Sequence, residues 1–139
     1  MAAQVIATNS ARAWVELVWS AGTHRFHLPF DGLEDVQNAC DAGPMEVLQR
    51  LENDTFRVHD VWAPIFYGLI HAPENELTPV AARELCEKWV RQRPLMETKL
   101  TAQVILSAAL VGVEDEQPKK PKGAKRRSPS ETGAGVSVK

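Results

Sequence analysis

The apolar residues of this chain change their spacing at Leu28 and Pro29. Before this point they recur at every second position, as in a strand with one buried face, and after it every three or four positions, as in an amphipathic helix. Segments 13–19 and 23–28 therefore predict two strands, and Gly22 between them is suited to a positive φ in the turn. The change of period restricts the fold to an N-terminal β-hairpin followed by helices.

The segment after the hairpin contains helix-boundary signals. Pro29 ends the second strand, Asp31 is placed to cap a helix, and Glu34 completes a box-like capping pattern. Gly43 predicts the end of this helix, and Pro44 predicts the start of the next. We interpret the acidic residues here as helix-start chemistry rather than as a catalytic carboxylate pair.

Three more helices are predicted in the segments "VHDVWAPIFYGLIH", "LTPVAARELCEKWV" and "LMETKLTAQVILSAALVG". Pro64 predicts a kink in the first of them or a start at Asp60, and Thr78 is predicted to cap the second with Pro79 in its first turn. The residues of the second helix expected to face inward are Ala81, Leu85, Cys86 and Trp89.

The predicted fold class is α+β and mostly α, with a two-stranded hairpin, four or five short helices and a disordered basic C-terminal tail. The expected organisation is a flexible N-terminus over 1–12, one domain over 13–112 and the tail over 113–139. A lone hairpin is marginal in water, so it is expected to pack on helices or on another subunit.

The last helix is apolar nearly all round from Val104 to Val111. A small domain has few layers in which to bury every side of such a helix, so part of it is expected to contact a partner or a second copy. The candidate partner-binding residues on this helix are Leu100, Val104, Ile105, Leu106 and Leu110.

Tryptophan gives a further candidate, because this residue type is enriched at interface anchors. Trp19, Trp62 and Trp89 fall on apolar stripes and are expected in the core. Trp14 shares a strand face with Glu16 and is the candidate exposed anchor, with edge packing inside the monomer as the alternative.

Charge is distributed unevenly along the chain. Residues 1–112 hold 9 Lys or Arg and 14 Asp or Glu, whereas residues 113–139 hold 7 basic and 4 acidic residues. The tail either solubilises the protein or binds nucleic acid or an acidic surface. The acidic body argues against nucleic acid as a partner. Six of these seven basic residues form one run, which consists of Lys119, Lys120, Lys122, Lys125, Arg126 and Arg127.

No motif for chemistry is visible in the sequence. His24 and His27 lie three positions apart on a strand and therefore on opposite faces, which excludes a shared metal. Cys40 and Cys86 are far apart, and phosphate-binding glycine loops and the GxSxG nucleophile turn are absent. We expect no catalytic residues, no metal, no cofactor and no membrane span.

The order of the segments resembles that of the small tail proteins of gene transfer agents and siphophage-like prophages, which are grouped with phage tail assembly chaperones. The resemblance covers about residues 13–112 and rests on the hairpin followed by "FDGLEDVQNACDAGP", "VHDVWAPIFYGLI", "LTPVAA" and "PLMETKLTAQVILSAALVG".

The resemblance implies a non-enzymatic tail assembly chaperone in the host cytoplasm. Its implied partners are the tape measure protein and the tail tube protein, with self-association also expected. The alternative is a structural tail tube or connector component that is retained in the virion tail. A DNA-binding regulator that uses the basic tail is a third hypothesis, against which the acidic body argues.

Overall fold

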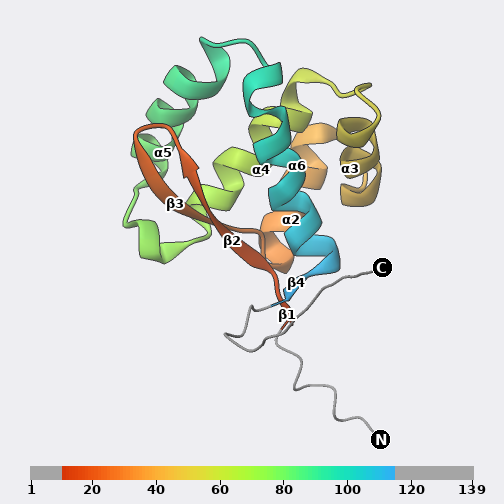
Figure 1. The fold of residues 1–139 in the computed structure, drawn as a ribbon, viewed down its shortest axis with the longest axis horizontal. Helices are drawn as coiled ribbons and strands as arrows, with labels where there is room; N and C mark the ends of the chain where they lie inside the picture. Colours follow the sequence, from red (N-terminus) through yellow and green to blue (C-terminus); the bar gives the residue numbers. More distant parts are fainter. Residues whose placement is uncertain (1–10, 115–139) are drawn as a thin grey trace, which may run out of the picture.

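The computed structural model describes residues 11–114. In chain order the elements are β1 (Ala11–Arg12), β2 (Trp14–Trp19), β3 (Gly22–His27), α2 (Phe30–Cys40), α3 (Pro44–Glu52), α4 (Val58–Ile70), η1 (Pro73–Asn75), α5 (Pro79–Cys86), η2 (Glu87–Arg91), α6 (Met96–Val111) and β4 (Val113–Glu114). Figure 1 shows the β2–β3 hairpin running across one side of the helices, with α6 in the middle of the helical group. Within residues 11–114 the predicted fold class, a two-stranded hairpin followed by helices, is confirmed.

The hairpin has the two faces that its sequence predicts. β2 and β3 pair antiparallel from Trp14 opposite His27 to Trp19 opposite Gly22. Val15 and Trp19 are buried on the inner face, whereas Val18 is 84% exposed on the outer face. The positive φ of the turn falls on Ser20, at 59°, and Gly22 instead begins β3, because the pairing leaves only a two-residue turn.

The hairpin finds its packing partners within the same chain. β3 packs on α4, and β2 packs on α6. At the edge of β3 the side-chain amide of Asn75 accepts the backbone N–H of Arg25 at 2.9 Å and donates to the carbonyl of Arg25 at 2.8 Å. This side chain satisfies two backbone groups that an edge strand otherwise leaves to solvent.

The predicted boundaries of the first two helices need correction. α2 begins at Phe30 after Pro29, and no side chain caps it, so Asp31 is not the cap. α2 ends at Cys40 because Asp41 adopts the left-handed conformation, with φ of 54°. Gly43 stands before Pro44 at the start of α3 and does not end α2.

The start of the next helix, α4, excludes one of the two predictions made from Pro64, and the other, a kink, stays a prediction. Its first residue is Val58, Asp60 lies in its first turn, and Pro64 is buried inside the helix. The start at Asp60 that Pro64 suggested is therefore wrong. The apolar surroundings of Pro64 stabilise the helix at a position where proline removes a backbone donor.

The helix α5 begins as predicted, but the residues that are fully buried differ from those predicted to face inward. The backbone N–H of Ala81 donates to Thr78 Oγ1 at 3.0 Å, which confirms the predicted cap. Cys86 is buried as expected, whereas the predicted inward residues Ala81, Leu85 and Trp89 are only half-buried. The fully buried stripe consists of Ala82, Cys86 and Val90.

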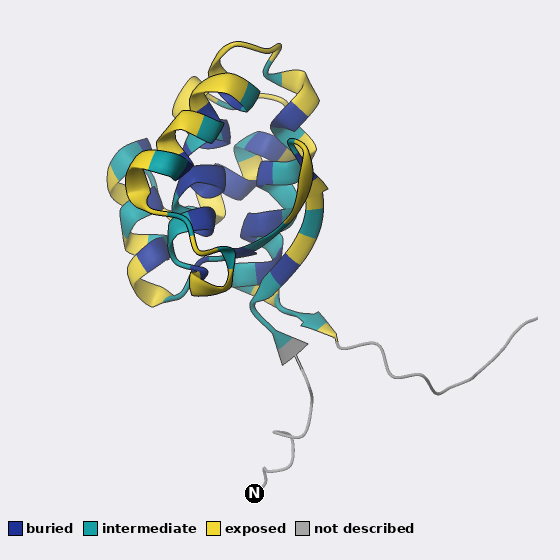
Figure 2. Ribbon diagram, turned by 90° about the vertical axis from the view of Figure 1, so that its left-hand side faces the viewer, coloured by how far each residue is buried: buried dark blue, intermediate teal, exposed yellow. Residues whose placement is uncertain are grey.

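The core lies between the hairpin and the helices. Figure 2 shows the buried residues gathered in this interior, with exposed residues along the outer faces of the helices. The largest fully buried apolar side chains include Phe26, Leu28, Leu51, Ile65, Leu69, Ile105 and Leu106. Trp19 belongs to this core, as the sequence predicts.

A glycine permits the close approach of α4 to its neighbours. A Cβ atom added at Gly68 would lie 3.3 Å from Cβ of Phe26 and 3.4 Å from Cγ2 of Ile105. The first distance is tighter than ordinary van der Waals contact and the second is at its lower limit, so the close packing of α4 on β3 depends on the missing side chain.

A second strand pair, which the sequence did not predict, joins the two ends of the described region. Ala11 pairs with Glu114, and Arg12 pairs with Val113, in antiparallel register. These residues fall in the flanks that the sequence analysis assigned to a flexible N-terminus and a disordered tail. The rest of those flanks, 1–10 and 115–139, lies outside the described residues.

Candidate interaction surface

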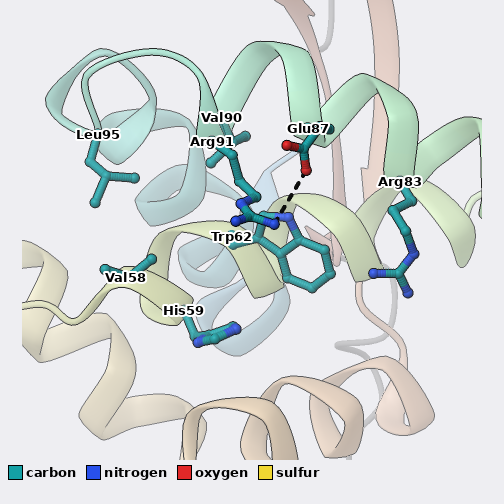
Figure 3. A pocket seen from close by; sticks show the side chains of 8 residues that line it. All are labelled: Val58, His59, Trp62, Arg83, Glu87, Val90, Arg91 and Leu95. Carbon is teal, nitrogen blue, oxygen red and sulfur yellow. Dashed lines mark hydrogen bonds and ion pairs between the residues drawn. The ribbon is translucent and has the colours of Figure 1, made fainter.

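A groove opens between the first turns of α4 and the outer side of α5 and η2 (Figure 3). Its volume is about 550 Å³. The residues that line it are Val58, His59, Trp62, Arg83, Glu87, Val90, Arg91 and Leu95. Figure 3 shows the indole of Trp62 in the middle of the groove, with Arg83 at one end and Leu95 at the other.

An aromatic cluster supports the floor of this groove. The Trp62 ring stacks on Phe66, with centroids 4.6 Å apart and planes 18° apart, and Tyr67 meets both rings edge-on. His59 also meets Trp62 edge-on at 6.0 Å. Trp62 packs against the core, but its side chain is only half-buried, so it lies at the edge of the core rather than inside it. Phe66 holds the core position, and one face of Trp62 is left for the groove.

The groove carries positive charge although the body of the protein is acidic. The guanidinium of Arg83 lies 5.6 Å from the Trp62 ring centroid and 5.0 Å from that of Phe66. Arg83 has no carboxylate partner within residues 11–114, whereas Arg91 is paired with Glu87 at 3.3 Å. Arg83 is therefore an uncompensated cation beside an aromatic surface.

The sequence-predicted site residues on α6 separate into two groups. Ile105 and Leu106 are buried in the core of the monomer, so they do not form a surface that a partner reaches. Leu100 is 62% exposed, and Val104 and Leu110 are half-buried. A partner contact through these three residues stays a prediction.

Trp14 packs within the monomer. Its ring is half-buried, and the guanidinium carbon of Arg25 lies 3.7 Å from the ring centroid. Arg12 also lies near this ring, at 4.6 Å. The predicted alternative, packing at the edge of the hairpin, describes this arrangement, and a role as a partner anchor stays a prediction. The six basic tail residues, from Lys119 to Arg127, lie outside the described residues.

The positions of the two cysteines make their thiols unreactive. Both are buried, and burial raises the pKa of Cys40 and of Cys86 to about 12. Asp60 adds to the shift at Cys40 through its charge. Among residues 11–114, no three His, Cys, Asp or Glu side chains form a group that could hold a metal ion. Nor is any helix of this region long and apolar enough to cross a membrane.

Two polar contacts in the fold could not be found from spacing along the sequence. His71 Nε2 lies 2.9 Å from Asp35 Oδ2, and the two residues are 36 positions apart in the sequence. Asp60 is wholly buried and lies 3.4 Å from the guanidinium of Arg50. The first contact joins α2 to the residue that follows α4, and the second joins α3 to α4, so only the tertiary fold brings these side chains together.

An aromatic-floored groove with an unpaired cation is a feature of surfaces that contact other proteins. A family model described as phage tail tube protein, GTA-gp10, matches residues 12–112. Because this match covers most of the chain, the protein belongs to that family of phage tail proteins. No curated protein and no solved structure matches the chain.

The match confirms the resemblance to gene transfer agent and phage tail proteins. The finer assignment to assembly chaperones is not supported by the family description, which names a tail tube protein. That description agrees better with the alternative that the sequence left open, a structural component of the tail.

Proposed function

We propose that this protein is a non-enzymatic structural component of a phage or gene transfer agent tail, a tube or connector subunit that stays in the particle. The observation that carries the proposal is the family match over residues 12–112, nearly the whole of the described region. The proposed location is accordingly the virion tail, and the proposed partners are other tail subunits.

The side chains of the described region support a role in contacts rather than in chemistry. The two thiols have a raised pKa of about 12, which leaves almost none of the nucleophilic thiolate at neutral pH. The groove beside Trp62 offers an aromatic surface and a guanidinium, which recognise apolar and acidic side chains of another protein.

Mass spectrometry of purified particles tests the proposal. A structural subunit should be present at a copy number comparable with that of other tail proteins, and particles from a strain that lacks the gene should have no completed tail. A major head protein serves as the internal reference for copy number. Absence of the protein from intact, tailed particles would refute the proposal.

A second candidate is a tail assembly chaperone that binds the tape measure protein and recruits tail tube subunits. The groove favours it, because Val58, Trp62 and Leu95 provide an apolar surface on which a striped helix could lie. A chaperone would be missing from particles but would keep co-expressed tape measure protein in solution. The two candidates therefore predict opposite results in the particle analysis.

A further inference from the structure

A second unusual surface lies at the start of α2. Phe30 is 76% exposed, although aromatic side chains of this size are usually covered. Asp31 and Glu34 are also exposed, and neither makes an ion pair within residues 11–114. Because positions four apart lie on one helix face, Phe30 and Glu34 present an apolar ring and a carboxylate side by side.

This surface is complementary to the groove in both charge and apolar character. The groove offers the open side of the Trp62 ring and an unpaired guanidinium on Arg83, and the start of α2 offers an unpaired carboxylate and an exposed ring. The Arg83 guanidinium lies 5.6 Å from the Trp62 ring centroid. Side chains one helical turn apart are separated by about 5–6 Å at Cβ, so Phe30 and Glu34 have the spacing to meet both groups at once.

Phe30 and Glu34 cannot reach the groove of their own molecule. The Cys40 thiol contacts the backbone carbonyl of His59 at 3.4 Å, so the end of α2 lies beside the groove. Phe30 stands ten residues earlier in the same helix, which places it roughly 15 Å away at 1.5 Å per residue. The complementary surfaces therefore lie apart on one molecule and can meet only between molecules.

We propose that copies of this protein associate head to tail, with Phe30 of one copy inserted against Trp62 of the next and Glu34 paired with Arg83. A contact between two different surfaces leaves a free groove at one end and a free α2 surface at the other. Repetition then gives a ring where the rotation between copies closes, and an open chain where it does not. The inference deepens the proposed tail function, since tube and connector subunits are built by repetition.

Sedimentation of the full-length protein over a range of concentrations tests this contact. The wild type should form species larger than a dimer, whereas Phe30→Asp and Arg83→Glu should each weaken association by at least about tenfold. Val18→Asp places the same charge on another exposed apolar residue, and Lys88→Glu makes the same charge change beside the groove. Both controls should associate like the wild type, and thermal melting should show that all four variants are folded.

Mixing the two weakened variants tests whether the contact is head to tail. Phe30→Asp keeps an intact groove and Arg83→Glu keeps an intact α2 surface, so the mixture should form a one-to-one dimer and nothing larger. In one chain, Glu34→Arg combined with Arg83→Glu should restore the association that each change weakens alone. Both results require the contact between the start of α2 and the groove, and a nonspecific loss of exposed apolar surface would produce neither.

Three results would overturn the proposal. The first is a wild type that is strictly monomeric or stops at a closed dimer. The second is a mixture of the two variants that forms no dimer. The third is loss of association in Arg83→Glu but not in Phe30→Asp, which would assign the groove to another occupant, such as the acidic stretch from Glu114 to Glu116 or a different protein. Particle composition is measured separately, so a failure here leaves the proposed tail function standing.

Discussion

The carboxylate of Asp60 accepts a 2.7 Å hydrogen bond from the backbone N–H of Arg57, and no part of the Asp60 side chain reaches solvent. The contact satisfies a donor at the start of α4 that has no partner within the helix. The same carboxylate lies 3.4 Å from the guanidinium of Arg50. Asp60 thus ties the start of α4 to α3.

We predict that Asp60→Ala lowers the free energy of unfolding by about 2–3 kcal/mol, since it leaves the Arg57 N–H without its acceptor. Asp60→Asn should cost less, because the amide oxygen can still accept this bond. Glu52→Gln, at an exposed acidic position, is the matched control and should change stability by less than about 0.5 kcal/mol. Urea denaturation measures the free energy of unfolding of all three variants. A value for Asp60→Ala equal to that of the wild type would show that the hydrogen bond from Arg57 does not stabilise the fold.

Much of this fold follows from local patterns. The alternation in 13–19 and the Thr78–Pro79 pair predicted the hairpin and the start of α5, because strand faces and helix caps depend on nearby residues. Of the two predictions made from Pro64, the start at Asp60 was wrong, since α4 begins at Val58 and holds the buried Pro64 inside it. The end of α2 was misplaced because Asp41, and not Gly43, adopts positive φ.

The candidate site was harder to predict than the fold. Trp62 and Phe66 follow the same apolar stripe, and nothing local indicates which of the two is covered by α5. The groove forms only where α4 meets α5 and η2, so its residues are brought together by tertiary packing. Helical spacing alone groups Phe30 with Leu33 and Val36 on one face of α2, so only the tertiary fold shows that Phe30 is exposed while Val36 is buried.

Two leucines of α6 differ in burial, so their replacement should have different effects on stability. Leu106 is wholly buried, so Leu106→Ala should lower the free energy of unfolding by about 2–5 kcal/mol. Leu100 is 62% exposed, and Leu100→Ala should change it by less than about 0.5 kcal/mol. Denaturation curves for the pair provide the measurement. Similar losses at both positions would mean that Leu100 is covered, as its predicted contact with a partner requires.

Trp14 and Arg25 form a stacked pair whose contribution can be measured. Arg25 is also held by Glu16 at 2.9 Å and Glu74 at 3.1 Å, so its guanidinium is fixed over the ring. A double-mutant cycle of Trp14→Leu and Arg25→Met should give a coupling free energy of about 0.5–1 kcal/mol. Self-association of Trp14→Leu should match the wild type. A loss of association in this folded variant would instead show that Trp14 contacts a partner.

His27 predicts part of the pH dependence of stability. Burial lowers its pKa below the ordinary value of 6.5, and the nearby Glu74 offsets this only in part. Below pH 6.5 the unfolded chain therefore binds more protons at this position than the folded protein does, so stability falls as the pH falls. The free energy of unfolding of His27→Asn should decrease less than that of the wild type between pH 7.5 and 5.5. An identical slope for the two proteins would contradict the shift at His27.

The thiols of Cys40 and Cys86 should react only when the protein unfolds. With a pKa of about 12, each folded-state thiol holds far less thiolate at pH 8 than an unfolded cysteine. Modification by a disulfide reagent should therefore be slower by on the order of a thousandfold in buffer than in 8 M urea. The single variants Cys40→Ala and Cys86→Ala assign the two rates. A thiol that reacts rapidly in the folded protein would show that its helix opens locally, and Cys40, beside His59 in the groove, is the position where binding of a partner should slow that reaction further.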